Sequence, residues 1–109
     1  MLVLHKRKIL DQIQEELTSK DRNLREIILF GSVSRSEHTP TSDIDLLLIT
    51  TKISETKNIF QGIRDTIFLT FSVPVTALYL APENFKTSKD PVIATVKKEG
   101  ISLWKKNKT

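Results

Sequence analysis

The stretch LFGSVSRSEHTPTSDIDL, residues 29–46, decides the fold prediction because it joins the end of one strand to the start of another. The apolar run Glu26–Phe30 stops at Gly31, as expected of a buried strand that ends in a tight turn. Residues 32–42 hold almost no apolar anchor, so we expect a loop there, with room for one helical turn after the glycine. Residues 43–50 then form a nearly continuous apolar run, which is typical of a strand covered on both faces.

Two amphipathic helices are expected to flank these strands. Apolar residues recur at three- and four-residue steps between Val3 and Leu17, and charged residues fill the other positions. A second helix is expected from Ser54, as its N-cap, to about Phe71, where apolar residues recur at four-residue spacing. Each helix therefore has one stripe that packs on a core.

The remainder of the chain continues the alternation of helix and strand. Val73–Leu80 has a strand pattern entered through Pro74, which a strand tolerates in its first residues or at an edge. Asp90 followed by Pro91 is typical of a helix start, and residues 101–104 predict a last short strand. The order helix, strand, strand, helix, strand, helix, strand favours an α/β fold, with a small mixed β-sheet flanked by helices.

Length and composition predict one folded domain over residues 1–109. Hydrophobic residues make up 39% and charged residues 28%, the balance of a folded domain and not of a disordered or membrane chain. No apolar run approaches the roughly 20 residues needed to span a bilayer. The basic residues 5–8 lie where a signal peptide would need its apolar stretch, so we expect a cytoplasmic protein.

Residue usage restricts the kinds of metal site and partner. Cysteine is absent and there are only two histidines, so a bound metal would have to be a hard ion held by carboxylates. The net charge of +4 suits an anionic partner such as a nucleotide or nucleic acid. Much of the surplus positive charge lies near the C-terminus, in Lys97, Lys98, Lys105, Lys106 and Lys108, and a solvated segment is enough to explain these lysines.

Gly31 and Ser32 form a candidate phosphate-binding turn. The missing side chain of Gly31 lets backbone amides approach a ligand closely. If a helical turn starts after Ser32, its amides and positive end face an anion, and the Ser32 hydroxyl adds a donor. By itself a Gly-Ser pair is most often only a turn.

Asp43 and Asp45 form a candidate metal site on the following strand. They lie two residues apart, so their side chains project from the same face of the strand. Two carboxylates at such a short separation repel each other unless a cation lies between them. Magnesium accepts a pair of carboxylate ligands and keeps coordination positions free for phosphate oxygens. An Asp-x-Asp is usually a polar strand end or a helix cap, but Asp45 lies inside an apolar strand, where an unpaired charge is costly.

These residues resemble the signature of the nucleotidyltransferase superfamily related to DNA polymerase beta, in particular its minimal, single-domain members. The signature has a Gly-Ser pair, about ten intervening residues and an Asp-x-Asp on the next strand. Gly31 and Ser32 match, residues 33–42 make ten, and Asp43 and Asp45 match. Two further residues of the same segment also fit the family's usual signature: Ser42, directly before the first aspartate, and Arg35 in the loop.

The resemblance implies the chemistry of nucleotidyl transfer. The Gly-Ser turn would hold the triphosphate of ATP or another nucleoside triphosphate, and Asp43 and Asp45 would hold Mg²⁺. An acceptor hydroxyl would attack the α-phosphate in line and displace pyrophosphate, while two metals share the developing charge. Arg35 would help neutralise the triphosphate, although a loop arginine is as often simply solvated.

The sequence departs from this family at one position. Members that transfer nucleotides carry a third carboxylate on a later strand, in a phrase such as Val-Asp-Leu, and Thr76 stands at the matching place. A neutral hydroxyl binds magnesium poorly and cannot act as a general base at neutral pH, so a second metal and activation of the nucleophile are unaccounted for. Asp65 and Glu83 are the nearest spare acids, and a structural role suits both better.

Three functions follow from these observations. The first is an active nucleotidyltransferase that moves AMP, or another nucleoside monophosphate, onto a protein or small-molecule hydroxyl. The second is a binding module that keeps the triphosphate site while transfer is lost or weakened. Minimal members of the family are often paired, as antitoxin to toxin, with a small helical HEPN-type protein, and either function fits that pairing. The third, nucleic-acid binding, is least favoured because most of the aromatic residues fit buried positions.

Overall fold

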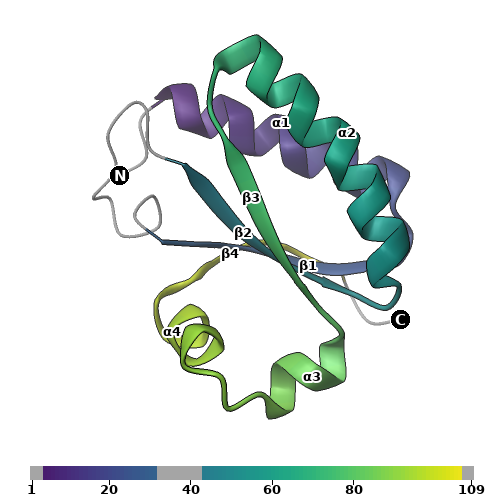
Figure 1. Ribbon diagram of the computed structural model, residues 1–109, viewed down its shortest axis with the longest axis vertical. Helices are drawn as coiled ribbons and strands as arrows, with labels where there is room; N and C mark the ends of the chain where they lie inside the picture. The colour runs from purple at the N-terminus through teal and green to yellow at the C-terminus, as the bar shows by residue number, and fades with distance from the viewer. Residues whose placement is uncertain (1–3, 32–42, 107–109) are drawn as a thin grey trace.

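The computed structural model describes residues 4–31 and 43–106. Over this part of the chain the secondary structure contains four helices and four strands (Figure 1). In chain order they are α1 (Leu4–Lys20), β1 (Leu24–Phe30), β2 (Ile44–Thr50), α2 (Ile53–Phe71), β3 (Val75–Leu80), α3 (Pro82–Thr87), α4 (Pro91–Glu99) and β4 (Ile101–Lys105). None of these helices combines the length and apolar character needed to cross a membrane.

The four strands form one mixed sheet in the order β3-β2-β1-β4. β1 pairs with β2 and with β4 in antiparallel fashion, whereas β2 and β3 are parallel and are joined through α2. Helices α1 and α2 cover one face of the sheet, and α3 and α4 lie against the other (Figure 1). The expectation of a small mixed β-sheet flanked by helices is confirmed.

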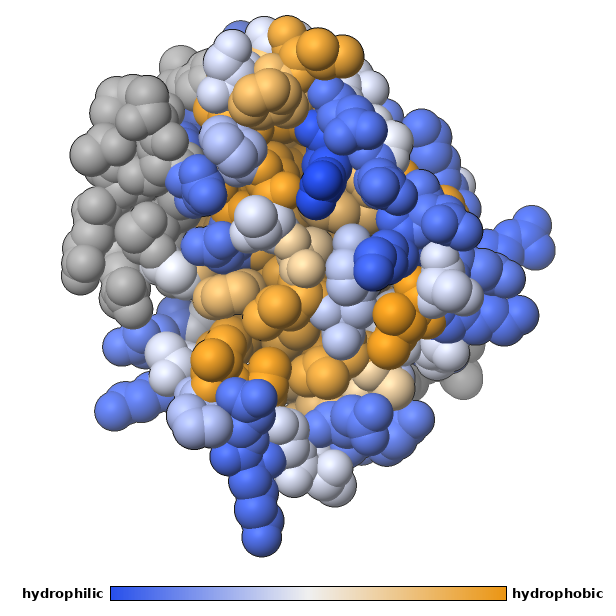
Figure 2. All heavy atoms as spheres, in the orientation of Figure 1, coloured by the Kyte–Doolittle hydropathy of each residue, from blue (hydrophilic) through white to orange (hydrophobic). Residues whose placement is uncertain are grey.

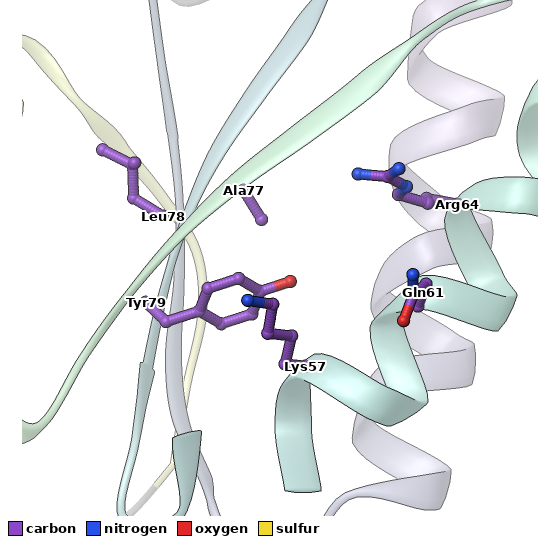
Figure 3. A pocket seen from close by; sticks show the side chains of 6 residues that line it. All are labelled: Lys57, Gln61, Arg64, Ala77, Leu78 and Tyr79. Atoms are coloured by element: carbon purple, nitrogen blue, oxygen red, sulfur yellow. The ribbon is translucent and has the colours of Figure 1, made fainter. Parts of the chain in front are cut away.

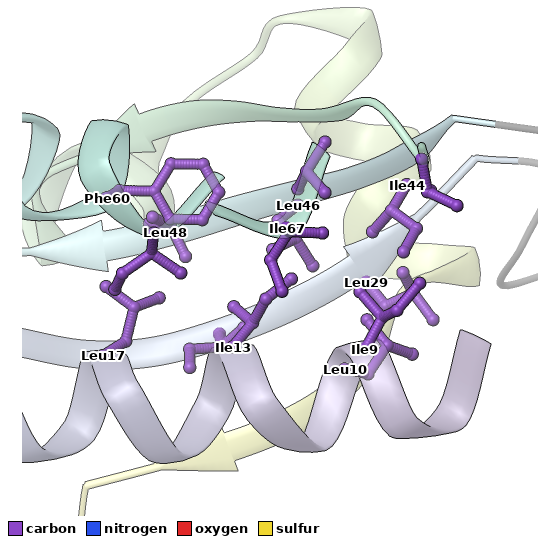
Figure 4. Packing of buried hydrophobic residues seen from close by; sticks show 14 of the residues in the cluster. Ile9, Leu10, Ile13, Leu17, Leu29, Ile44, Leu46, Leu48, Phe60 and Ile67 are labelled. Atoms are coloured by element: carbon purple, nitrogen blue, oxygen red, sulfur yellow. The ribbon is translucent and has the colours of Figure 1, made fainter. Parts of the chain in front are cut away.

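The larger core lies between the sheet and the helices α1 and α2. The apolar stripe of α1 meets Phe60 and Ile67 of α2 over the strand side chains of this face (Figure 4), and Ile63 belongs to the same cluster. The α1 stripe consists of Ile9, Leu10, Ile13 and Leu17. On the other face a smaller cluster packs Ile93 and Val96 of α4 against the sheet. Leu46, Leu47 and Leu48 are fully buried, so β2 is covered on both faces as its apolar run predicts.

A buried polar relay fixes the N-terminal end of α2 to the sheet. The Thr56 hydroxyl donates to Asp21 Oδ2 over 2.5 Å, and the hydroxyl oxygens of Thr50 and Thr56 lie 2.6 Å apart. Because Thr56 has a single proton and gives it to Asp21, Thr50 must donate to Thr56. Thr50 in turn accepts the Lys52 amide over 3.2 Å. The side chains of Asp21, Thr50 and Thr56 are buried, so their polar atoms need these hydrogen bonds in place of water.

The elements depart from the sequence prediction in three details. The prediction of Ser54 as a helix cap is wrong, because α2 begins at Ile53 and its N-cap is Lys52, with no side-chain hydrogen bond. Helix α1 continues to Lys20 through polar residues, since a helix keeps its solvent-facing side polar without ending. The short helix α3 has no buried residue and therefore left no apolar stripe to detect. The predicted start of α4 is confirmed, since Asp90 Oδ1 accepts the Val92 amide over 2.8 Å.

Candidate active site

The parallel pairing of β2 with β3 places Asp45 directly opposite Thr76. The Thr76 hydroxyl donates to Asp45 Oδ1 over 2.5 Å, so it holds one oxygen of the carboxylate in place. Asp45 is half-buried and Thr76 is exposed at the edge strand. The position that the sequence comparison assigned to a third carboxylate is therefore in hydrogen-bonding contact with the second one, and it contains a neutral hydroxyl.

Gly31 lies against the other oxygen of the same carboxylate. It follows the end of β1, where Phe30 pairs with Asp45, and its φ of 82° is in the left-handed region. A Cβ at this position would come within 2.5 Å of Asp45 Oδ2. Only glycine accepts both this backbone conformation and this contact without strain. The structure thus gives Gly31 a role beyond a close ligand approach, because its missing side chain makes room for Asp45.

Asp43 directly precedes β2 and has an exposed side chain. The negative charge of Asp43 interacts with Lys6, a fully buried residue in the first turns of α1. Burial lowers the pKa of the Lys6 ammonium, and the negative charge of Asp43 opposes that shift. Sequence reasoning missed Lys6 as part of the site. The available signal was its spacing of four from Leu10, which places a lysine on the apolar stripe of α1.

The structure brings together three of the residues singled out from the sequence and separates two others from them. Gly31 and Thr76 each lie against Asp45, whereas Ser32, Arg35 and Ser42 lie outside the described residues. The two spare acids do not join the site. Asp65 is exposed in the middle of α2, and Glu83 lies in the first turn of α3, beyond the end of β3 that is remote from Thr76.

The donor set fits a hard cation with open coordination positions. Asp43 and Asp45 are two residues apart at the start of β2, so two carboxylates come from the same end of one strand. Within residues 4–31 and 43–106 no group of three or more His, Asp or Glu side chains is arranged to hold a metal. A cation at Asp43 and Asp45 would therefore keep positions for ligand oxygens, as magnesium does with nucleotides.

Comparison with protein families supplies the class to which this arrangement belongs. The model of the nucleotidyltransferase domain matches residues 10–107, which is nearly the whole chain. The chain belongs to the nucleotidyltransferase domain family. No match was found among curated proteins.

Solved structures share the fold of this nucleotidyltransferase domain. A candidate nucleotidyltransferase from Sulfolobus solfataricus is 29% identical, with 93% of this chain and 83% of that chain covered and a TM-score of 0.57. A chain of a toxin-antitoxin complex with AMP-PNP is 19% identical, with 88% and 73% covered and a TM-score of 0.61. A chain from the complex of a tri-AMPylated Shewanella oneidensis HEPN toxin with its MNT antitoxin is 18% identical, with 94% and 71% covered and a TM-score of 0.51. The predicted resemblance to the nucleotidyltransferase superfamily is confirmed by the family match, and these structures show the shared fold.

Proposed function

We propose that this nucleotidyltransferase domain binds a nucleoside triphosphate together with Mg²⁺ and transfers a nucleoside monophosphate, AMP by preference, to a hydroxyl of a HEPN-type partner. In this proposal Asp43 and Asp45 hold the metal and carry catalysis, and Gly31, Ser32, Arg35 and Ser42 bind the nucleotide. The observation that carries the proposal is the fixed position of Asp45, whose two carboxylate oxygens lie against Thr76 and Gly31.

The residues of this chain prepare the site before any ligand arrives. Thr76 donates to Asp45 Oδ1, which fixes the carboxylate without occupying all of its lone pairs. Gly31 leaves the space that Oδ2 needs. A bound magnesium ion would supply charge stabilisation to the triphosphate oxygens. Holding a carboxylate in its working orientation in advance removes the cost of ordering it when the substrate binds.

The choice of acceptor and nucleotide is supported by what similar structures contain. One neighbour in fold was crystallised with AMP-PNP, an ATP analogue, and another is a complex of an AMPylated HEPN toxin with an MNT antitoxin. These proteins are under 25% identical to this chain, so they support its fold directly and its partner only by analogy. The pairing predicts that AMP is transferred to a tyrosine, serine or threonine hydroxyl of the partner.

A second candidate function is a nucleotide-binding antitoxin with weakened transfer, and Thr76 is the observation that favours it. Position 76 beside Asp45 holds a threonine, so it supplies neither a third carboxylate ligand nor a base for the acceptor hydroxyl. Both candidates predict nucleotide binding. They differ in the rate of transfer, and in whether a carboxylate at position 76 would raise it.

A label-transfer assay separates the two candidates. The wild type, Thr76→Asp and Asp43→Ala are incubated with radiolabelled ATP and Mg²⁺, each alone and with the product of the neighbouring gene. Because metal-assisted activation of a nucleophile is worth several kcal/mol, Thr76→Asp should raise the rate of transfer by about a hundredfold or more. Asp43→Ala should abolish transfer.

The matched control is Asp65→Ala, which removes an exposed carboxylate from α2 and should leave transfer unchanged. Rapid transfer by the wild type together with no effect of Thr76→Asp would show that position 76 is not the third-acid position. Undiminished transfer by Asp43→Ala would contradict the proposed site itself.

A further inference from the structure

A hollow lies in the groove between β3 and α2, and none of its lining residues belongs to the carboxylate site. Its volume is about 260 Å³. Three residues from each element line it, Ala77, Leu78 and Tyr79 from β3 and Lys57, Gln61 and Arg64 from α2 (Figure 3).

The three β3 residues show that this groove runs along the edge of the sheet. Side chains of a strand alternate between its faces, so Ala77 and Tyr79 point to one side and Leu78 to the other. A single hollow that touches all three must include the strand's edge. Within the described ranges β3 pairs with β2 alone, so its outer edge presents backbone N–H and C=O groups to whatever occupies the groove.

The α2 side of the groove is a stripe of hydrogen-bond donors. Lys57, Gln61 and Arg64 are spaced by four and three residues and so lie on one face of the helix. Lys57 and Arg64 extend from α2 toward β3 (Figure 3). Among the described residues Lys57 has no ion pair, and Arg64 has only the exposed contact of its Nε with Asp65 Oδ1 at 3.9 Å. Such a contact contributes little, so both cations are available to an anion.

Tyr79 adds a neutral donor between these cations and the strand. Its hydroxyl is directed toward α2 (Figure 3). Burial raises the pKa of the Tyr79 phenol, and the positive charge of Arg64 opposes that shift. The phenol is therefore protonated at neutral pH and can donate a hydrogen bond in the groove.

The opposite side of the same edge is apolar. Leu78 is 43% exposed although it belongs to a strand. Figure 2 shows apolar side chains gathered in the middle of this face, bordered by hydrophilic side chains. A ligand that follows the edge of β3 therefore meets cations and donors on the α2 side and apolar surface on the Leu78 side.

We propose that the outer edge of β3 accepts an extended segment of a partner protein as an added strand, with acidic side chains toward Lys57 and Arg64 and apolar side chains toward Leu78. Strand addition uses main-chain hydrogen bonds for affinity and alternate side chains for specificity. The segment must alternate acidic and apolar residues, because neighbouring side chains of a strand face opposite sides. A nucleic-acid strand would use the cations and leave the strand edge and Leu78 without partners. This interface is separate from the proposed transfer reaction.

The test uses a fluorescent peptide of the same length as β3 in which glutamate and valine alternate, and its binding is followed by fluorescence anisotropy. The double variant Lys57→Glu, Arg64→Glu should weaken binding by about tenfold or more, because two attractive contacts become repulsive. The control variant Lys89→Glu, Lys98→Glu makes the same change of charge at exposed lysines outside the groove and should change the affinity by less than about twofold.

Two further measurements place the peptide and separate this proposal from the proposed function. Hydrogen exchange of the outward-facing amides of β3 should slow when the peptide binds. The affinity for ATP with Mg²⁺ should be the same in both double variants as in the wild type.

Three results would overturn the proposal. The first is no binding of the alternating peptide, or equal binding of a peptide of the same composition with its glutamates and valines in separate blocks. The second is an equal loss of affinity in the two double variants. The third is tighter binding of a single-stranded oligonucleotide that is lost in the Lys57→Glu, Arg64→Glu variant, which would assign the groove to nucleic acid.

Discussion

At the scale of single residues, the site depends on how closely Gly31 approaches Asp45. A side chain at position 31 would meet both a positive φ and the Asp45 carboxylate. Gly31→Ala should therefore lower stability by about 1–2 kcal/mol and weaken binding of ATP with Mg²⁺ by about tenfold or more. Thermal unfolding and calorimetry measure the two effects.

The matched control for this variant is Gly62→Ala in the middle of α2. A Cβ at Gly62 would meet nothing within 4 Å, so the substitution should stabilise the helix by about 0.5–1 kcal/mol. If Gly31→Ala behaved like Gly62→Ala in both measurements, the close packing of Gly31 on Asp45 would not matter for the site.

Lys6 is a buried lysine whose ammonium group interacts electrostatically with the proposed metal ligand Asp43. A nearby cation repels a divalent metal, so Lys6→Met should raise the affinity for Mg²⁺ in the absence of nucleotide by about fivefold. Titration of each protein with Mg²⁺ alone measures this change. Lys8→Met removes an exposed lysine from the same helix and should have little effect. Weaker metal binding by Lys6→Met would instead show that Lys6 is needed to position Asp43.

At the scale of the elements, the buried relay from Asp21 through Thr56 to Thr50 sets where α2 begins on the sheet. Thr56→Val keeps the shape but removes the hydroxyl, which leaves the buried Asp21 carboxylate without this donor. The free energy of unfolding should fall by about 2–3 kcal/mol. Thr66→Val, at an exposed position of the same helix, should cost no more than about 0.5 kcal/mol. Equal losses in urea unfolding of the two variants would contradict a structural role for the relay.

Sequence patterns predicted the elements well where one face of an element is apolar. The stripe of α1 and the continuous apolar run of β2 identified both elements and their burial. The relay was not predictable, because Asp21 and Thr56 are 35 residues apart and meet only after the sheet forms. The start of α2 was also misplaced, because a serine near a helix start is a preference and does not fix the N-cap.

The candidate site was predictable only as far as neighbouring residues on one strand. The spacing of Asp43 and Asp45 predicted a pair of carboxylates at one strand start, whereas the contacts of Asp45 with Gly31 and Thr76 connect different parts of the chain. The comparison with the family's Val-Asp-Leu segment identified Thr76, and the parallel register of β2 and β3 places Thr76 beside Asp45. Lys6 lies on α1, far along the chain from Asp43, and only its interruption of an apolar stripe signalled a special position.

At the scale of the whole molecule, the proposed metal site and the proposed partner groove use different residues of the sheet. Asp43 and Asp45 lie at the start of β2, where β1 ends, and the cationic groove follows the outer edge of β3. A partner bound along β3 would leave the carboxylates open to a nucleotide. The two proposals are therefore compatible with each other and can be tested separately.

Calorimetric titration with ATP, with and without Mg²⁺, tests the central claim most directly. The wild type should bind ATP at least about tenfold more tightly when Mg²⁺ is present, because the metal joins the carboxylates to the triphosphate. The double variant Asp43→Asn, Asp45→Asn should lose this dependence on Mg²⁺, whereas Asp11→Asn, Asp65→Asn, with the same change of charge at exposed positions, should keep it. Equal affinity of the wild type with and without Mg²⁺, or an unchanged dependence in the Asp43→Asn, Asp45→Asn variant, would contradict the account.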